Sequence, residues 1–316
     1  MKTKALVLFA LAASLFLITC KKEDDGGSPS PSPLATPNPL RSYLAQNLAD
    51  ATQSFTVNAA TGGSIQGNRG SRVDFVPGAF VTATGSPVTG TVQVKMVEVL
   101  TMADMLLMNK QTVGMDNGVA KMLKSGGELK ISATQGGSEV FIVPNGATVD
   151  VPGSSYDPQM DVFYGTEDAD GDLLWNLSTD TLTLQDSAVW DTTSGNWFYY
   201  EFDADSLNWL NCDYFPAGAT APLLVDAPDE TNGANTMVWV AVPSLNGVLG
   251  AWYNDGLFNT NQVPIGYAAI VVALYQDEDD NYHSSFTNIT VATGMTVPIT
   301  FSPTTLAQFE ADLDAL

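Results

Sequence analysis

The feature that most constrains the fold is a long succession of short apolar segments, each ended by glycine, proline, asparagine or aspartate. They recur from residue 54 to residue 301 and read SFTVNA, RVDFVPG, GTVQVKMVEV, GELKISAT, VFIVPN, ATVDVPG, WFYYEF, APLLVDAP, TMVWVAVP, YAAIVVALYQ, FTNITVA and TVPITF. Short strands with closely spaced turns are typical of antiparallel sandwiches, not of parallel sheets with crossover helices. The pattern therefore predicts an all-β protein with two antiparallel β-sandwich domains in tandem.

Individual segments indicate where their strands lie. Residues 91–99 alternate, with Val92, Val94, Met96 and, less cleanly, Glu98 on one face. Residues 267–275 are apolar throughout, which predicts a strand in the centre of a sheet.

Helical signals are few. Residues 40–51 carry an apolar stripe of Leu40, Tyr43, Leu44 and Leu48, and residues 102–108 can form a further turn. The clearest helix is C-terminal, where we expect Ser302 to cap and Pro303 to occupy the first turn.

These signals predict five consecutive parts. They are a signal peptide over 1–19, a lipidated disordered tether over 20–39, a β-sandwich with a short leading helix over 40–152, a linker of acidic turns over 153–186, and a second β-sandwich with the C-terminal helix over 187–316.

The N-terminus has the layout of an export signal. Lys2 and Lys4 precede an apolar run over 5–18 that is too short for a comfortable membrane span. Leu17-Ile18-Thr19-Cys20 resembles the lipobox of bacterial lipoproteins, although Thr19 stands where that family usually has Gly, Ala or Ser. The resemblance implies lipidation of Cys20 and cleavage just before it. A plain cleaved signal or an N-terminal anchor helix is the alternative.

The residues after Cys20 suit a spacer. Residues 28–39 are rich in Ser and Pro and have no apolar period, which is typical of a semi-rigid tether. Residues 21–25, Lys-Lys-Glu-Asp-Asp, resemble the export signal of surface lipoproteins of the Bacteroidetes. The alternative is an ordinary solvated charge run. The resemblance implies an outer-membrane lipoprotein that faces outward, with the periplasmic face as the other possibility.

The net charge limits the classes of binding partner, and the number of cysteines limits the possible disulfides. The chain carries 12 Lys and Arg against 35 Asp and Glu, a net charge of −23, which argues against nucleic acid and against a polybasic grip on anionic lipid. Membrane contact is therefore expected through the lipid alone. Only two cysteines are present, so lipidation of Cys20 leaves Cys212 without a disulfide partner.

One third of the chain resembles a known module. Val76-Pro77-Gly78-Ala79-Phe80, the strand over 90–99 and the step at Ser125-Gly126-Gly127 resemble the ZU5 domain of ankyrins and netrin receptors. The resemblance implies a β-sandwich that serves protein contacts. Read from the residues alone, Pro77, Gly78, Gly126 and Gly127 are structural turn positions, and Phe75, Val76 and Phe80 are expected in the core.

Self-cleavage, which some ZU5 relatives perform, has no support. The single histidine, His283, is followed by Ser284-Ser285 and lies far from the matching residues.

No catalytic constellation is evident. Cys212 would need a base, and only His283 could serve, so we interpret Cys212 as a buried structural cysteine. One histidine also gives neither a serine triad nor a zinc spacing. We therefore expect no enzymatic activity. A carboxylate-dependent hydrolase is kept as a minor alternative, because 35 acids always supply pairs.

Two acidic turns are candidates for binding calcium. Asp168, Asp170 and Asp172 stand at alternate positions around a glycine, as in half of an oxygen-ligand loop, but the acids that an EF-hand needs at its first and twelfth positions are missing. Residues 277–280 form a second acidic turn. A solvated turn is the alternative for both.

Aromatic residues suggest a ligand. Trp190, Trp197, Trp209 and Trp239 fall in the second predicted domain, and Trp239 is expected in its core. Trp252 and Tyr253 lie in a segment rich in Gly and Asn, which predicts a loop that could stack on a sugar ring.

The sequence as a whole favours a lipid-anchored surface protein that acts as a non-enzymatic interaction or structural module, with an unknown protein as partner. A glycan-binding accessory protein is the alternative.

Overall fold

The computed structural model describes residues 38–153, 157–180, 182–185 and 198–316. The predicted signal peptide, Cys20, nearly all of the tether, Trp190 and Trp197 lie outside these residues. In the described ranges, no helix has both the length and the apolar character needed to cross a membrane.

The N-terminal half folds into two sheets. The larger has ten strands, with the main path β1 (Gln53–Asn58), β5 (Thr91–Val99), β8 (Lys124–Gln135), β15 (Asn208–Tyr214), β11 (Asp161–Glu167), β12 (Leu173–Leu177), β6 (Val113–Asp116) and β7 (Val119–Met122). Beside β8 lies β9 (Ser138–Ile142), which also pairs with β4 (Phe80–Val81). The smaller sheet has five strands, β13 (Thr183–Gln185), β14 (Phe198–Ala204), β10 (Ala147–Gly153), β3 (Arg72–Phe75) and β2 (Gly63–Gln66).

The C-terminal half forms an eight-stranded sheet. Its order is β24 (Thr296–Pro298), β17 (Leu224–Asp226), β20 (Leu257–Thr260), β19 (Gly247–Asn254), β18 (Thr236–Val242), β22 (Ala268–Gln276), β23 (Tyr282–Thr290) and β25 (Ser302–Thr304). A two-stranded sheet joins β16 (Thr220–Ala221) to β21 (Val263–Pro264). The predicted all-β class, with sandwich-type sheets and a short C-terminal helix, is confirmed. Two strand pairs, β6 with β12 and β17 with β24, are parallel and were not expected.

Helices are few and short. They are α1 (Pro39–Asp50), α2 (Met102–Leu107), α3 (Leu306–Asp314) and the 3₁₀ turn η1 (Pro243–Leu245). Asn38 caps α1, and its predicted stripe is confirmed, because Leu40 and Leu44 are buried and Tyr43 and Leu48 pack beside them. The predicted start of the C-terminal helix is wrong. Thr305 caps α3, because its side chain accepts a hydrogen bond from the backbone of Gln308, while residues 302–304 pair as β25.

Three apolar cores hold the sheets. The first lies between the ten-stranded and five-stranded sheets and contains Val92, Val94, Val149, Phe202 and Cys212. The third is built on the C-terminal sheet around Val240, Val271 and Phe258. The second, here called the junction core, joins Trp175 and Trp209 of the N-terminal half to Trp239 and Val272 of the C-terminal half and to Phe309 of α3.

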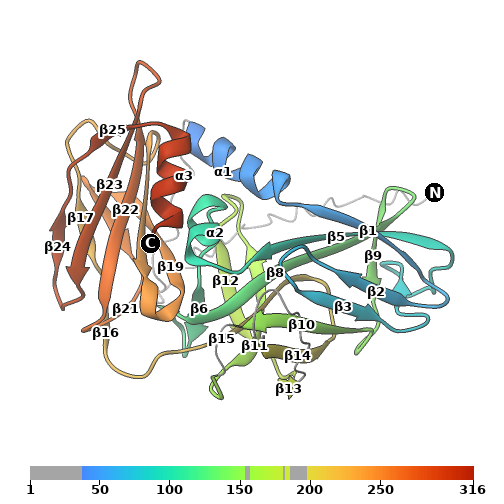
Figure 1. Ribbon diagram of the computed structural model, residues 1–316. Helices are drawn as coiled ribbons and strands as arrows, with labels where there is room; N and C mark the ends of the chain where they lie inside the picture. Colours follow the sequence, from blue (N-terminus) through green and yellow to red (C-terminus); the bar gives the residue numbers. More distant parts are fainter. Residues whose placement is uncertain (1–37, 154–156, 181, 186–197) are drawn as a thin grey trace, which may run out of the picture. The chain divides into compact units, whose positions relative to one another are not determined.

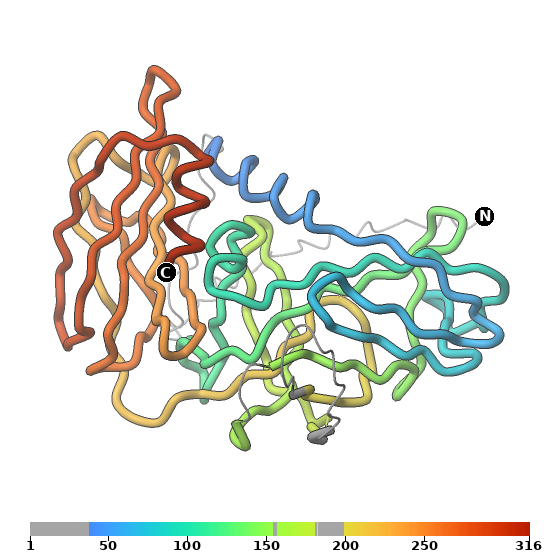
Figure 2. The backbone as a smooth tube through the Cα atoms, viewed as in Figure 1, coloured from blue at the N-terminus to red at the C-terminus, as the bar shows by residue number. Residues whose placement is uncertain are grey.

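The junction core explains two strands that are apolar on both faces. β18 is buried at all seven positions, and alternate residues of β18 and β22 enter the junction core and the C-terminal core. The central sheet position expected for residues 267–275 is therefore confirmed, since β22 lies between β18 and β23. Figure 2 traces the chain from α1 directly into β1 of the N-terminal half.

The boundary between the halves differs from the predicted one. The expected linker over 153–186 contains β11 and β12, and the expected second domain gives β14 and β15 to the N-terminal sheets. The acidic turn that suggested a linker is only the hairpin between β11 and β12. All described residues belong to a single compact unit by their contacts.

Asp150 gives this fold a pH dependence. It lies on β10 between Arg72 of β3 and Glu201 of β14. Burial, and then the charge of Glu201, raises the pKa of Asp150 to about 6, above its ordinary value of 3.8. The folded state therefore holds a proton there that the unfolded chain has lost, and stability falls as the pH rises from about 4 through about 6.

Asp150→Asn should remove this loss. We expect the variant to melt at a higher temperature than the parent at pH 7.5, and the difference to shrink at pH 4, where the parent carboxyl is protonated. Thermal melts of both chains at the two pH values check this. An equal difference at both would show that Asp150 does not titrate as described.

Candidate functional site

A cavity of about 620 Å³ opens where loops of the N-terminal half meet the η1 turn. The residues that line it come from the β2–β3 loop, the β5–α2 connection, the start of β8, the end of β10, β14 and η1. We call it the η1 cavity. A volume between 300 and 1,000 Å³ is the usual size of a small-molecule site.

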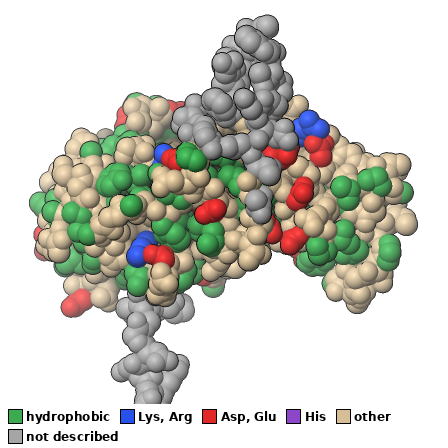
Figure 3. All heavy atoms as spheres, turned by 90° about the horizontal axis from the view of Figure 1, so that it is seen from below, with side chains coloured by type: hydrophobic (Ala, Val, Ile, Leu, Met, Phe, Trp, Pro, Cys, Tyr) green, Lys and Arg blue, Asp and Glu red, His purple; other side chains and the backbone are tan. Residues whose placement is uncertain are grey.

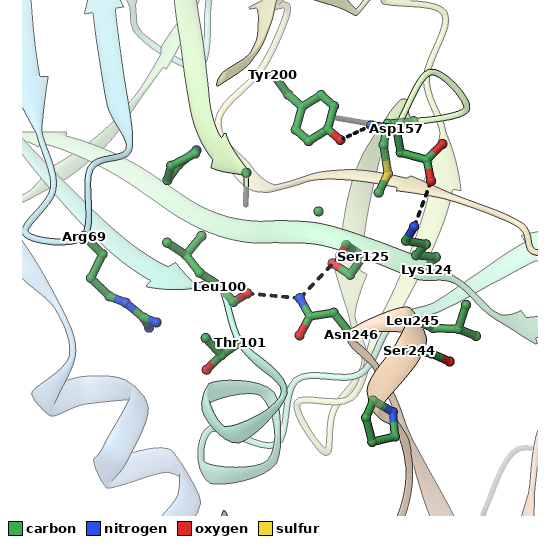
Figure 4. Close-up of a pocket in the computed structure, with 15 residues that line it drawn as sticks. Arg69, Leu100, Thr101, Lys124, Ser125, Asp157, Tyr200, Ser244, Leu245 and Asn246 are labelled. Atoms are coloured by element: carbon green, nitrogen blue, oxygen red, sulfur yellow. Dashed lines mark hydrogen bonds and ion pairs between the residues drawn. The ribbon is translucent and has the colours of Figure 1, made fainter. Parts of the chain in front are cut away.

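Asn246 fixes one wall of the η1 cavity. It follows η1 with φ 44°, in the left-handed region that asparagine tolerates better than most residues. Its Nδ2 donates to the carbonyl oxygens of Leu100 at 3.0 Å and Ser125 at 3.3 Å, as Figure 4 shows. One amide therefore ties the C-terminal half to the β5–α2 connection and to β8 of the N-terminal half at the rim of the cavity.

Lys124 supplies one positive charge. Its Nζ lies 2.8 Å from Asp157 Oδ2 and 5.5 Å from the ring of Tyr214. The hydroxyl of Tyr200 accepts a hydrogen bond from the backbone N–H of Asp157 at 2.9 Å. The hydrogen bond between Lys124 and Asp157 is the main reason that the pKa of the lysine is raised and that of the carboxyl is lowered. Both groups are therefore charged at neutral pH.

Arg69 supplies the other positive charge and lies on the opposite side of the view in Figure 4. Its guanidinium pairs with Asp104, which also closes the capping box of α2 with Thr101. The backbone N–H of Arg69 donates to Glu98 Oε2 at 3.0 Å. Together with donors from Ser71 N and Gln53 Nε2, this hydrogen bond compensates for the burial of Glu98 at the apolar end of β5.

The local charge differs from that of the chain. Residues 38–316 hold 8 Lys and Arg against 32 Asp and Glu, after Lys2, Lys4, Lys21, Lys22 and the three acids of 23–25 are subtracted from the totals of 12 and 35. The wall of the η1 cavity holds two cations and one acid, and the hydroxyls of Thr101, Ser125 and Ser244 lie beside them. On the face drawn in Figure 3, the few basic side chains lie beside acidic ones. Both cations are paired, Lys124 with Asp157 and Arg69 with Asp104, so the η1 cavity is a mixed polar and apolar site whose charges are locally balanced in an acidic protein.

The first calcium candidate is a closed turn. Asp168 Oδ1 accepts the backbone N–H groups of Asp170 at 2.9 Å and Asp172 at 3.0 Å. Asp172 Oδ1 accepts from Asn109 Nδ2 at 2.9 Å and lies 3.5 Å from Arg41 Nη1. Backbone donors, Asn109 and Arg41 therefore engage Oδ1 of Asp168 and of Asp172 within the protein, and calcium binding by this loop stays a prediction.

The second acidic turn is closed in the same way. Asp277 Oδ1 accepts the backbone N–H groups of Asp279 and Asn281, and its Oδ2 lies 3.0 Å from His283 Nε2. The bond to His283 is the main reason that the pKa of Asp277 falls to about 2. Within the described residues, no three or more His, Cys, Asp and Glu side chains are grouped to hold a metal.

The aromatic candidates do not form a platform. Trp252 and Tyr253 lie on β19, not in a loop, and consecutive strand residues point to opposite faces. Tyr253 is exposed and its ring packs against Phe258 at 5.2 Å, whereas Trp252 is half-buried. Trp175, Trp209 and Trp239 are buried in the junction core, as expected for Trp239. The predicted loop at Trp252 and Tyr253 is therefore wrong, and ligand binding by these two residues stays a prediction.

Some of the residues predicted to have a structural role have it, and others do not. Cys212 is fully buried, and burial followed by the charge of Asp213 raises the pKa of its thiol well above the usual range, so the structural interpretation holds. Pro77 and Gly78 form the expected turn, where Gly78 has φ 75°. Val76 is 42% exposed, not buried, although its neighbours Phe75 and Phe80 are in the core.

Gly126 and Gly127 lie in a strand, not in a turn. The register between β8 and β15 shifts at this point, since Asn211 faces Glu128 and Asp213 faces Ser125. This irregularity places Ser125 and Gly126 on the wall of the η1 cavity. The sequence marked the glycines, but it gave no signal that linked them to Lys124, Tyr200 or Asn246.

Comparison with known proteins assigns no family to this chain. No family model and no curated protein matches the chain. Among solved structures, it is similar to the crystal structure of gamma-CGTase from an alkalophilic Bacillus clarkii, at 12% identity and a TM-score of 0.20, over 73% of this chain and 38% of that chain. Because that protein is an enzyme, the finding contradicts the expectation of a non-enzymatic protein, and the expectation is withdrawn. A TM-score of this size carries no argument about the fold or chemistry of this chain.

Proposed function

We propose that the protein is a lipid-anchored surface protein of a bacterial outer membrane, and that its folded part binds a small anionic, hydroxyl-rich ligand in the η1 cavity. A hexuronic acid is one ligand of this class. The observation that carries the proposal is the pair of cations beside three hydroxyls in one cavity, Lys124 and Arg69 with Thr101, Ser125 and Ser244.

The ligand class follows from the donors. Cationic nitrogens form strong hydrogen bonds to carboxylates, and serine and threonine hydroxyls both donate to and accept from sugar hydroxyls. The buried tryptophans offer no stacking surface, so recognition rests on polar contacts. The net negative charge of the chain would repel an anion in solution. Near the cavity, the side chains of Lys124 and Arg69 would attract it.

The location is supported by the N-terminal sequence. Leu17 to Cys20 fits a lipobox apart from Thr19, and residues 28–39 fit a spacer. Two or more acyl chains hold a protein firmly in a membrane. An unknown surface protein is the alternative partner for the folded part.

Protease treatment of intact cells tests the location. The full chain should lose its folded part, and Cys20→Ser should release the chain from the membrane fraction. Full protection of the chain in intact cells, together with cleavage after the outer membrane is opened, would place it in the periplasm.

A matched sugar panel tests the ligand. The full chain in detergent should melt at a higher temperature with glucuronate or galacturonate than with glucose or galactose, which differ from them at a single oxidised carbon. Equal melting temperatures with acid and neutral sugars at up to 50 mM would contradict an anion site.

A further inference from the structure

Two carboxylates behind the wall of the η1 cavity have no role in the site described so far. Glu128 and Asp213 are both 0% exposed. Both carboxylate oxygens of Glu128, and Oδ1 of Asp213, have no hydrogen-bond partner among the described residues. A carboxylate in an apolar interior is costly unless a countercharge or donors compensate for lost water. This pair is therefore neutralised either by bound protons or by a bound cation.

Strand register gathers further oxygen atoms around the pair. Glu128 on β8 lies directly opposite Asn211 on β15, and opposed residues of antiparallel strands share one face. Asn211 Nδ2 donates to Asp213 Oδ2 at 2.7 Å, which holds Asp213 on the same side. Ser125 Oγ lies 3.3 Å from Asn211 Oδ1. Ser125, Asn211 and Asp213 are therefore linked side by side, and Glu128 lies on the same face of the strand pair, opposite Asn211.

The protein's own cations are committed elsewhere. Lys110 is the cation whose charge lowers the pKa of Glu128, but its Nζ donates to Glu167 at 2.8 Å and to the carbonyl of Gly171 at 2.7 Å. The charge of Asp104 acts in the opposite direction. Within the described residues, no side chain or backbone donor bonds to either carboxylate oxygen of Glu128.

We infer that Glu128 and Asp213 bind a hard divalent cation, Ca²⁺, with Asn211 and Ser125 as adjoining oxygen donors. Carboxylate, amide and hydroxyl oxygens are the ligands that Ca²⁺ prefers. Cys212, the soft ligand nearest in sequence, belongs to the core on the other side of the sheet. Ser125 also lines the η1 cavity, which gives a cation a path from solvent to the pair.

Calcium-dependent melting of the full chain tests the site. In detergent and chelator-treated buffer, Ca²⁺ at 100 times its dissociation constant should raise the melting temperature by about 5 °C, and EGTA should reverse the rise. Glu128→Gln and Asp213→Asn keep the shape of each side chain and remove its charge, so each should abolish the rise. Asp168→Asn, in the exposed acidic turn, is the matched control and should keep it.

Terbium luminescence tests the same site in the unaltered chain. Trp209 lies two residues before Asn211 on β15, on the same face, so its ring should sensitise bound Tb³⁺. Added Ca²⁺ should quench that emission, and this readout holds even if a variant fails to fold. The inference is overturned if neither Ca²⁺ nor Tb³⁺ produces a signal with the unaltered chain, or if Glu128→Gln and Asp213→Asn respond like the parent.

Discussion

Trp239→Ala is expected to lower the free energy of unfolding by about 3–5 kcal/mol, the usual cost of truncating a buried tryptophan. The ring of Trp239 is 1% exposed in the junction core, and its Nε1 donates to Asn109 Oδ1 at 2.8 Å. Asn109 in turn donates to Asp172. The substitution would open a cavity between the two halves and leave a polar atom of Asn109 without its donor.

The number of unfolding transitions is as informative as the free energy of unfolding. Because the junction core contains residues from both halves, urea unfolding of the parent should show one transition by tryptophan fluorescence and by circular dichroism. Trp252→Ala, on the neighbouring strand, is the matched control and should cost about 1 kcal/mol, because that ring is half-buried. Two separate transitions in the parent would show that the halves are independent domains, as the sequence suggested.

Gly126→Ala is the second large effect, with an expected loss of about 2–4 kcal/mol. A methyl group on Gly126 would lie 2.8 Å from the carbonyl oxygen of Cys212 and 3.3 Å from the ring of Tyr200. The first neighbour is backbone in the middle of a sheet, so it cannot rotate away. The adjacent strand β15 would have to shift, and with it the wall of the η1 cavity.

Gly250→Ala is the matched control for this prediction. Gly250 also lies in a strand, but its added methyl group would meet its nearest neighbour, Gln111 Oε1, at an ordinary 3.6 Å. Urea melts of both variants should show a large loss for Gly126→Ala and less than about 1 kcal/mol for Gly250→Ala. Similar losses would mean that the position in the strand, rather than the close approach to Cys212, decides the cost.

Periodicity predicted the elements well because local burial follows it. The alternation over 91–99 and the apolar run over 267–275 became β5 and β22, and the stripe of Leu40 and Leu44 became the buried face of α1. The start of α3 was misplaced, because Ser302-Pro303 resembles a cap while Thr305 makes the hydrogen bond. Ser302 and Thr305 are both residue types that cap helices. Because residues 302–304 pair with β23 as strand β25, the helix is capped by Thr305.

The domain boundary was misjudged for a physical reason. An acidic, turn-rich stretch is compatible with a linker and with a hairpin, and only the pairing of β15 with β8 and β11 distinguishes the two. The β15 residues lie about 80 positions from their partners in β8 and about 50 from those in β11, and no local pattern records such pairing.

The candidate site could not be predicted from the sequence either, because its residues come together only through long-range contacts. Ser125 and Gly126 were marked as a strand entry, but Lys124, Tyr200 and Asn246 meet only because η1 docks against β8. The acidic turns drew attention by composition, and their carboxylates proved to be bonded within the protein. Glu128, and Oδ1 of Asp213, have no such partner among the described residues, and both acids lie in strands where nothing in the sequence marks them.

A calorimetric titration of galacturonate into the full chain and into Lys124→Met tests the central claim, that the η1 cavity binds an anionic ligand. Loss of a charged hydrogen bond of about 1.5–3 kcal/mol should weaken binding by about 10- to 100-fold. Lys121→Met, which breaks the similar pair of Lys121 with Asp116 at 2.6 Å outside the cavity, should bind as the parent does. Equal affinities for the parent and Lys124→Met, or no heat from the parent at saturating ligand, would contradict the claim.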